Sequence, residues 1–154
     1  MGFEAKLKEL GIVLPEAPRP VAAYVPYIKV DGLVFTAGQL PVMDGAVRFT
    51  GRVGAELTVE AGREAARLCV LNCLAVIRAA AGSLDNVLQL VKLNGYVASA
   101  PDFHGQPQVL NGASELLETV FGPAGRHARR AVGVCALPLN AAVEVDLVVK
   151  IAGG

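Results

Sequence analysis

The spacing of apolar positions changes along the chain, and each spacing predicts a different element. Helical spacing over residues 3–10 predicts a short helix that ends at Gly11. Three prolines within residues 15–20 then predict an extended segment, because a residue that precedes proline avoids helical backbone angles. Residues 1–20 are therefore expected to form an N-terminal helix and a proline-rich lead-in.

Strand patterns follow this lead-in. Residues 21–30 and 33–37 are predicted to be strands, and Asp31-Gly32 between them is typical of a two-residue hairpin turn. A further short strand is expected near residues 46–50. The chain is thus predicted to begin its sheet with a hairpin.

Two long helices are predicted next, separated by a strand. Thr58 is suited to cap the first helix, which runs to about Ala81 and is followed by Gly82. The second helix spans about residues 106–120. Between them, residues 87–97 are long and apolar enough for a central strand.

Residues 131–137 and 142–151 are predicted to be the last strands, which completes the order β-β-(β)-α-β-α-β-β. This order predicts one α/β (α+β) domain over residues 1–154, with a mixed six-stranded sheet and two long helices on one face. The other face still carries Val, Leu and Ile, so it also needs a cover.

Composition indicates what that cover is. The chain is 53% hydrophobic and 18% charged, with a mean hydropathy of +0.48, which is apolar for a soluble domain. No stretch of 18 residues is free of charge, so a membrane span is not expected. A subunit interface accommodates the apolar surplus, because obligate interfaces resemble a divided core.

Charge and cysteine content exclude several classes. The net charge is zero and the pI is about 6.7, so no broad basic field for nucleic acid is expected. The N-terminal residues lack a signal pattern, and a cytoplasmic location is expected. The odd number of cysteines argues against a disulfide framework, no metal-ligand spacing is present, and core packing is expected for Cys69, Cys73 and Cys135.

A local basic cluster holds the first candidate site. Arg126, His127, Arg129 and Arg130 lie between a glycine-rich loop and an apolar strand. Alternation places Arg129 and Ala131 on one face of that strand and Arg130 on the other. The fork of Arg129 is suited to hold a carboxylate through two hydrogen bonds. The alternatives are a solvated strand end or a structural ion pair, and His127 is interpreted as a structural or peripheral contact.

The last strand holds the second candidate. Glu144 and Asp146 share one of its faces, and Val143 and Val145 share the other. A carboxylate in an apolar strand is suited to position or activate a water. The alternative is an exposed charge on an edge strand.

These stretches resemble the reactive-intermediate deaminase family, known as RidA or YjgF-like and often labelled endoribonuclease L-PSP. The resemblance covers about residues 20–152 in order and spacing. It rests on FTAGQLP at 35–41, Asn111, HAR at 127–129, Leu137-Pro138 and VEV at 143–145. The longer N-terminus and the stretches around Asn111 and His127 look like a distinct branch of that family.

The resemblance implies a fold, an assembly and an activity. The fold would be chorismate-mutase-like, with three chains packing their sheets into a central β-barrel and with clefts between the subunits. Well-studied members hydrolyse small 2-imino or enamine acids, such as 2-aminoacrylate, to 2-oxo acids and ammonia. They need no cofactor, and neither a cofactor nor a metal is expected here.

The resemblance also assigns roles to individual residues. Arg129 matches the arginine that grips the substrate carboxylate, and Glu144 matches the glutamate that positions the attacking water. Both are predicted to be catalytic. The further substrate-binding residues that it implies are Tyr24, Ala37, Gly38, Asn111 and Ala131.

Three positions depart from the family pattern and keep other functions open. Ala37 replaces a frequent serine, Arg130 a serine or threonine, and Ala131 a cysteine, which makes the pocket wall less polar. The second hypothesis is therefore a non-catalytic homotrimer that binds small carboxylates or a protein partner. A ribonuclease or translation inhibitor is the poorest fit, because the chain has no net positive charge and no basic stripe.

Overall fold

One mixed five-stranded sheet forms the centre of the computed structural model, which describes residues 2–20 and 23–153. Its spatial order is β1-β2-β7-β5-β6. Only β5 and β6 pair in parallel; the other neighbours are antiparallel. The strands are β1 (Tyr27–Val30), β2 (Leu33–Thr36), β5 (Val87–Ala98), β6 (Ala128–Val134) and β7 (Val143–Ile151).

The predicted α+β class is confirmed, but the prediction of six strands in one sheet is wrong. Two short strands, β3 (Val42–Met43) and β4 (Ala46–Val47), form a separate hairpin. They pair with each other across a turn at Asp44-Gly45, where both residues have positive φ. Each of them pairs with the other and not with a strand of the main sheet.

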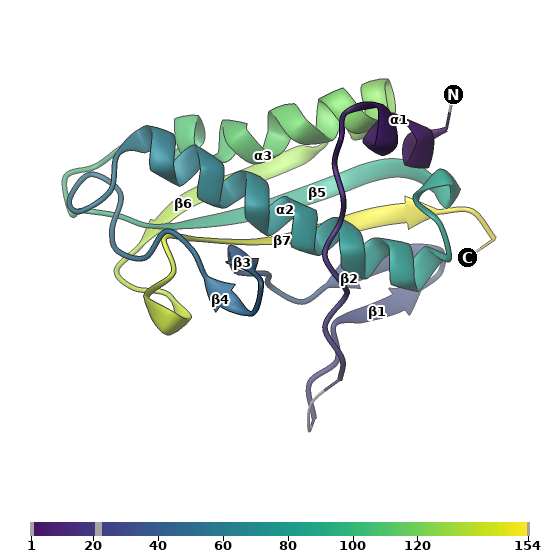
Figure 1. Cartoon of the computed structure of the whole chain (residues 1–154), viewed down its shortest axis with the longest axis horizontal. Helices are drawn as coiled ribbons and strands as arrows, with labels where there is room; N and C mark the ends of the chain where they lie inside the picture. The colour runs from purple at the N-terminus through teal and green to yellow at the C-terminus, as the bar shows by residue number, and fades with distance from the viewer. Residues whose placement is uncertain (1, 21–22, 154) are drawn as a thin grey trace.

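Two long helices, α2 (Val59–Ala81) and α3 (Gln106–Phe121), cover one face of the sheet, and the opposite face carries none of the described helices (Figure 1). The predicted ends of α2 are confirmed. The Thr58 hydroxyl accepts the Ala61 N–H at 3.1 Å, and Gly82 ends the helix with φ 84°. No helix within residues 2–20 and 23–153 has the length and apolar character needed to cross a bilayer.

Alternation along β7 determines which residues form the core. Val143, Val145 and Leu147 are fully buried beneath the helices, while the residues between them lie on the other face. Cys69 and Cys73 on α2 are buried against this strand, as predicted, and burial raises the pKa of both thiols. The same prediction is wrong for Cys135, which is exposed just beyond the end of β6.

Strand β6 lies three residues earlier than the predicted 131–137. Its parallel ladder with β5 runs from the Lys92–Ala128 pair to the Ala98–Val134 pair, so the two strands end together. Arg129 and Arg130 therefore lie inside the strand rather than before it. At the other edge, β1 is confined to Tyr27–Val30, and the first two residues of the predicted 21–30 strand lie outside the described residues.

The N-terminal residues pack onto the domain. Helix α1 (Phe3–Glu9) lies near one end of α3, and the segment after it crosses α2 (Figure 1). Leu7 and Leu14 are buried in the core. The Glu4 carboxylate accepts hydrogen bonds from Arg78 Nη2 at 2.6 Å and from Leu84 N–H at 2.9 Å, and Arg78 lowers the pKa of Glu4.

The close approach of α2 and α3 generates a prediction at Gly112. A Cβ there would collide with the backbone carbonyl oxygen of Arg63 on α2. Glycine to alanine usually stabilises a helix interior by roughly 0.5–1 kcal/mol. Here we expect Gly112→Ala to destabilise the fold by about 1–3 kcal/mol, because overpacking outweighs that gain. Urea unfolding would measure the change.

Glu118→Ala is the matched control, because Glu118 is exposed on the same helix. It should change the free energy of unfolding by less than about 0.5 kcal/mol. A Gly112→Ala variant as stable as the wild type would show that the two helices separate easily.

Candidate functional site

Arg129 lies on the outermost strand of the sheet with its side chain directed toward α3. It pairs with Leu93, which is fully buried on the helix-covered face. Arg129 Nη1 donates to Asn111 Oδ1 at 2.8 Å and to Ser114 Oγ at 3.2 Å. The half-buried guanidinium is therefore fixed by two side chains of α3.

Two further residues extend this network. Ser114 Oγ lies 2.9 Å from His127 Nε2, and His127 Nδ1 lies 2.6 Å from the carbonyl oxygen of Gly125. A carbonyl oxygen only accepts, so Nδ1 carries a proton. The sequence prediction missed Ser114. Its signal was the three-residue spacing from Asn111, which places both side chains on one helix face.

Glu144 and Gly38 form a second group, on the opposite face of the sheet. Glu144 lies between the buried Val143 and Val145, so its side chain points away from the helices. Gly38 lies beside β7, because Gln39 exchanges backbone hydrogen bonds with Val145. A Cβ on Gly38 would lie 2.6 Å from Glu144 Oε2. Any side chain at position 38 would therefore force the Glu144 carboxylate to move.

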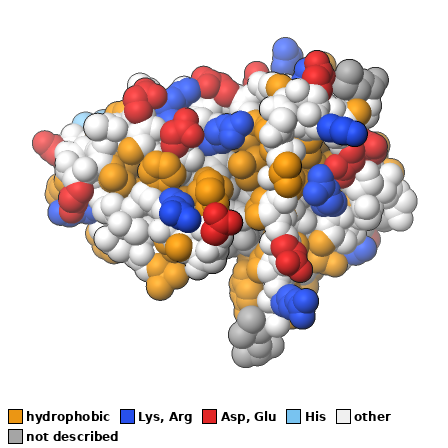
Figure 2. All heavy atoms as spheres, in the orientation of Figure 1, with side chains coloured by type: hydrophobic (Ala, Val, Ile, Leu, Met, Phe, Trp, Pro, Cys, Tyr) orange, Lys and Arg blue, Asp and Glu red, His pale blue; other side chains and the backbone are white. Residues whose placement is uncertain are grey.

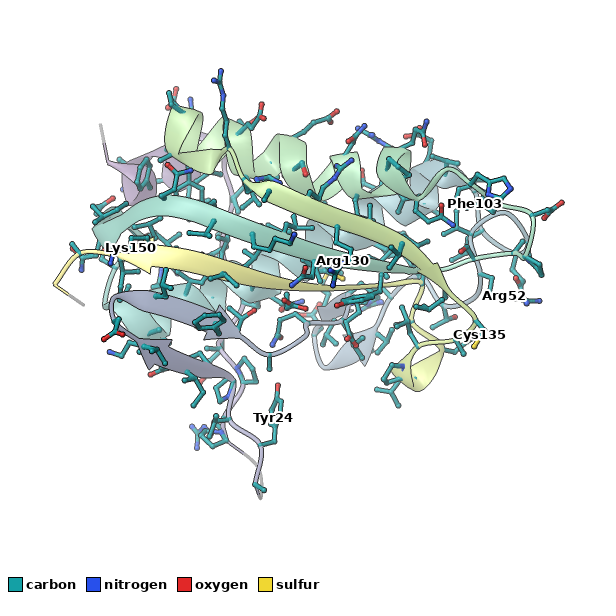
Figure 3. All side chains as sticks on the ribbon, turned by 180° about the vertical axis from the view of Figure 1, so that it is seen from behind. Tyr24, Arg52, Phe103, Arg130, Cys135 and Lys150 are labelled. Atoms are coloured by element: carbon teal, nitrogen blue, oxygen red, sulfur yellow. The ribbon has the colours of Figure 1, made fainter. Side chains whose placement is uncertain are left out.

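Burial on the open face raises the pKa of two carboxyl groups. Partial burial raises the pKa of Glu144, and the neighbouring Asp146 raises it further. Burial also raises the pKa of Asp146, although Asn94 and Arg130 oppose this effect. Asn94 Nδ2 donates to Asp146 Oδ1 at 2.8 Å. Arg130 lies over the middle of this face (Figure 3), opposite in direction to Arg129 as predicted.

One chain does not unite all the predicted site residues. Arg129, Asn111 and Ala131 lie on the helix side of β6, whereas Gly38 and Glu144 lie on the open side of the sheet. Tyr24 is 45% exposed and lies on the segment before β1, which extends beyond the edge of the sheet (Figure 3). Ala37 follows β2, and its N–H donates to the Pro26 carbonyl.

A separate hollow of about 410 Å³ lies at the end of β6. Arg52, Phe103 and Cys135, labelled in Figure 3, contribute to its lining, together with Gly133. A Cβ on Gly133 would lie 2.6 Å from Gln106 Nε2, so glycine keeps this end of the strand close to α3. Within residues 2–20 and 23–153, no group of three His, Cys, Asp or Glu side chains could hold a metal ion.

The charge distribution on one face of the molecule agrees with the composition. On the face shown in Figure 2, basic and acidic side chains are interspersed, and the described residues form no continuous basic stripe there. A phosphate backbone would meet repulsive and attractive groups alike. The local basic residues near Arg129 suit a small anion better.

Comparison with known proteins establishes the family. Residues 4–151 match the family model described as "YjgF/chorismate_mutase-like, putative endoribonuclease". The chain belongs to the YjgF/chorismate mutase-like family. The predicted resemblance is thereby confirmed, and the fold class with it.

Three relatives show how broad this YjgF-like family is. Protein TCP17 of Trypanosoma cruzi is 49% identical over 96% of the chain and 92% of its own length. A 2-iminobutanoate/2-iminopropanoate deaminase of Dermatophagoides farinae is 29% identical over 91% of the chain and 94% of its own length. The crystal structure of Atu1372 from Agrobacterium tumefaciens, a protein described as having unknown function, matches with a TM-score of 0.90 and 47% identity. The match covers 97% of the chain and 92% of Atu1372.

The raised pKa of Glu144 predicts a specific dependence of stability on pH. The folded protein holds this proton more tightly than the unfolded chain does. Protonated Glu144 therefore stabilises the fold fully below its pKa in the unfolded chain, and this stabilisation is lost as the pH rises through its pKa in the folded protein. We expect Glu144→Gln to have a higher Tm than the wild type at pH 7, with the difference narrowing toward pH 4.

Thermal unfolding followed by circular dichroism from pH 4 to 8 would measure this difference. Glu118→Gln, on the exposed face of α3, is the control and should leave Tm unchanged across the range. A wild type that is more stable than Glu144→Gln at pH 7 would contradict the assignment of a destabilising charge.

Proposed function

We propose that the chain is a cofactor-independent enamine/imine deaminase that hydrolyses small 2-imino acids, such as 2-aminoacrylate and 2-iminobutanoate, to 2-oxo acids and ammonia. The observation that carries this proposal is the fixed guanidinium of Arg129. Asn111 and Ser114 hold Nη1, and a prepositioned fork is suited to clamp a carboxylate. Family membership and the named deaminase among the relatives support the same reaction.

The chemistry needs few groups. Arg129 would bind the carboxylate and so orient the adjacent imine carbon. Ionised Glu144 would take a proton from a water, whose oxygen attacks that carbon and forms a carbinolamine. The proton taken from the water passes to the imine nitrogen as the carbinolamine forms. The hydroxyl proton then follows it to the nitrogen, which leaves as ammonia while the carbonyl group of the 2-oxo acid forms. An imine is already electrophilic, so positioning supplies much of the acceleration.

We further propose that the reaction takes place in clefts between the chains of a homotrimer. Arg129 and Glu144 lie on opposite faces of one sheet, so a second chain is needed to bring such a pair together. The open face is suited to association, because Ile28, Phe35 and Val132 are 53%, 42% and 40% exposed on it. Asn94 Oδ1 is buried and has no hydrogen-bond partner among the described residues. It is available to accept a hydrogen bond from a neighbouring chain.

Arg129→Ala tests the activity directly. Hydrogen bonds to a charged group contribute about 1.5–3 kcal/mol each, so losing both bonds of the clamp should lower kcat/KM by at least about 100-fold. A dehydratase would generate 2-iminobutanoate in the assay, and semicarbazide would trap the imine that is not hydrolysed. The measurement is the yield of 2-oxobutanoate relative to the semicarbazone. Arg126→Ala, on the same segment but exposed, should keep full activity. A wild type no faster than buffer would reject the proposal.

Mixing two inactive variants tests whether neighbouring chains share the site. Arg129→Ala and Glu144→Gln chains, unfolded and refolded together, would form mixed trimers in which one cleft of three is intact. Random assembly should then restore about a quarter of wild-type activity, because three-quarters of the trimers contain both chains. Refolding each variant alone is the control. No recovery from stable mixed trimers would place the site within one chain.

A non-catalytic carboxylate binder is the second candidate. Ala37 and Ala131 remove polar groups from the predicted wall of the cleft, and this observation favours binding without turnover. Thermal stabilisation by 2-oxo acids that depends on Arg129, without any acceleration of imine hydrolysis, would establish this alternative.

A further inference from the structure

The network behind Arg129 contains more polar groups than a carboxylate clamp requires. Four groups form a chain of contacts in space: the Gly125 carbonyl, the His127 ring, the Ser114 hydroxyl and the Arg129 guanidinium. Their separations are 2.6, 2.9 and 3.2 Å. Each link is within hydrogen-bonding distance, and the last one ends on the group that the proposed function depends on.

The direction of these hydrogen bonds follows from the first link. His127 Nδ1 must donate to the Gly125 carbonyl, so we assign the ring the Nδ1–H tautomer, in which Nε2 is an acceptor. The Ser114 hydroxyl then donates its only proton to Nε2. Its oxygen keeps lone pairs for Arg129 Nη1. His127 therefore determines that Ser114 presents an acceptor to the arginine, rather than a competing proton.

The consequence concerns which edge of the guanidinium remains available. Nη1 carries two N–H groups, and the two acceptors Asn111 Oδ1 and Ser114 Oγ use both of them. The remaining N–H groups are those of Nε and Nη2, which form one of the two planar forks that can bind a carboxylate.

We infer that Ser114, oriented by His127, is a positioning residue that directs the Nε/Nη2 edge of Arg129 toward the substrate carboxylate. This inference rests on the proposed function and goes beyond it, because it assigns a role to two residues that do not touch the reacting atoms. It also predicts a side-on carboxylate complex rather than one through both terminal nitrogens.

A readout that needs no ligand tests the first half of the inference. In the protein labelled with ¹⁵N-arginine, the two Nη1 protons should give separate NMR signals, because two acceptors slow rotation about the Cζ–Nη1 bond. Arg129→Lys would assign these signals by their loss. They should merge in Ser114→Ala and remain separate in Ser114→Thr, which keeps the hydroxyl. Unchanged signals in Ser114→Ala would overturn the inference.

Ligand binding tests the second half. We expect Ser114→Ala to weaken the binding of 2-oxobutanoate about tenfold by calorimetry, as loss of about 1.4 kcal/mol implies, and Ser114→Thr to restore most of it. His127→Leu should resemble Ser114→Ala, whereas His127→Gln keeps an acceptor and should recover. In an Arg129→Lys background, Ser114→Ala should have no further effect. If Ser114→Ala weakens 2-oxobutanoate binding in the Arg129→Lys background as much as in the wild type, its role is merely structural and the inference is rejected.

Two outcomes separate this inference from the proposed function. If turnover is absent while oxo-acid binding and its dependence on Ser114 persist, the deaminase is rejected and the positioning role stands. If Ser114→Ala turns over imine and binds oxo acid like the wild type, the positioning role is rejected and the deaminase stands. Stoichiometric labelling of Ser114 by a fluorophosphonate, lost in His127→Leu, would instead show a nucleophile and overturn the inference.

Discussion

The alternation of side chains across β6 is the constraint on which the site depends. Arg129 and Arg130 are neighbours in the chain, but the pleat sends them to opposite faces of the sheet. One guanidinium reaches the polar side chains of α3, and the other lies with Asp146 on the open face. A shift of one residue in the ladder with β5 would send Arg129 to the open face and Arg130 to the helix side.

The same constraint makes the two halves of the predicted site structurally independent. The half around Arg129 is built by a helix and an edge strand, and it depends on α3 lying close to the sheet. The half around Glu144 is built by β7 and by the turn at Gly38, where the absence of a Cβ leaves room for the carboxylate. An assembly that covers the open face is therefore part of the proposed chemistry rather than an addition to it.

The helix layer supports this arrangement through small residues. Gly112 allows α3 to approach the Arg63 backbone on α2, and Gly125 lies against the backbone of Leu117. The second contact holds the segment that leads into β6, and the same Gly125 offers its carbonyl to His127. Gly125 therefore takes part both in helix packing and in the hydrogen-bond network that orients Arg129.

By itself, the sequence determined the elements and the faces. Periodicity identified both long helices, Thr58 and Gly82 specified the ends of α2, and alternation correctly separated Arg129 from Arg130, because each of these signals acts within a few residues. Only the tertiary structure decided the bounds of β6, the separate β3–β4 hairpin, the exposure of Cys135 and the network of Ser114 with His127 and Arg129. These features depend on contacts between segments distant in the chain, and no local pattern specifies which segments will meet.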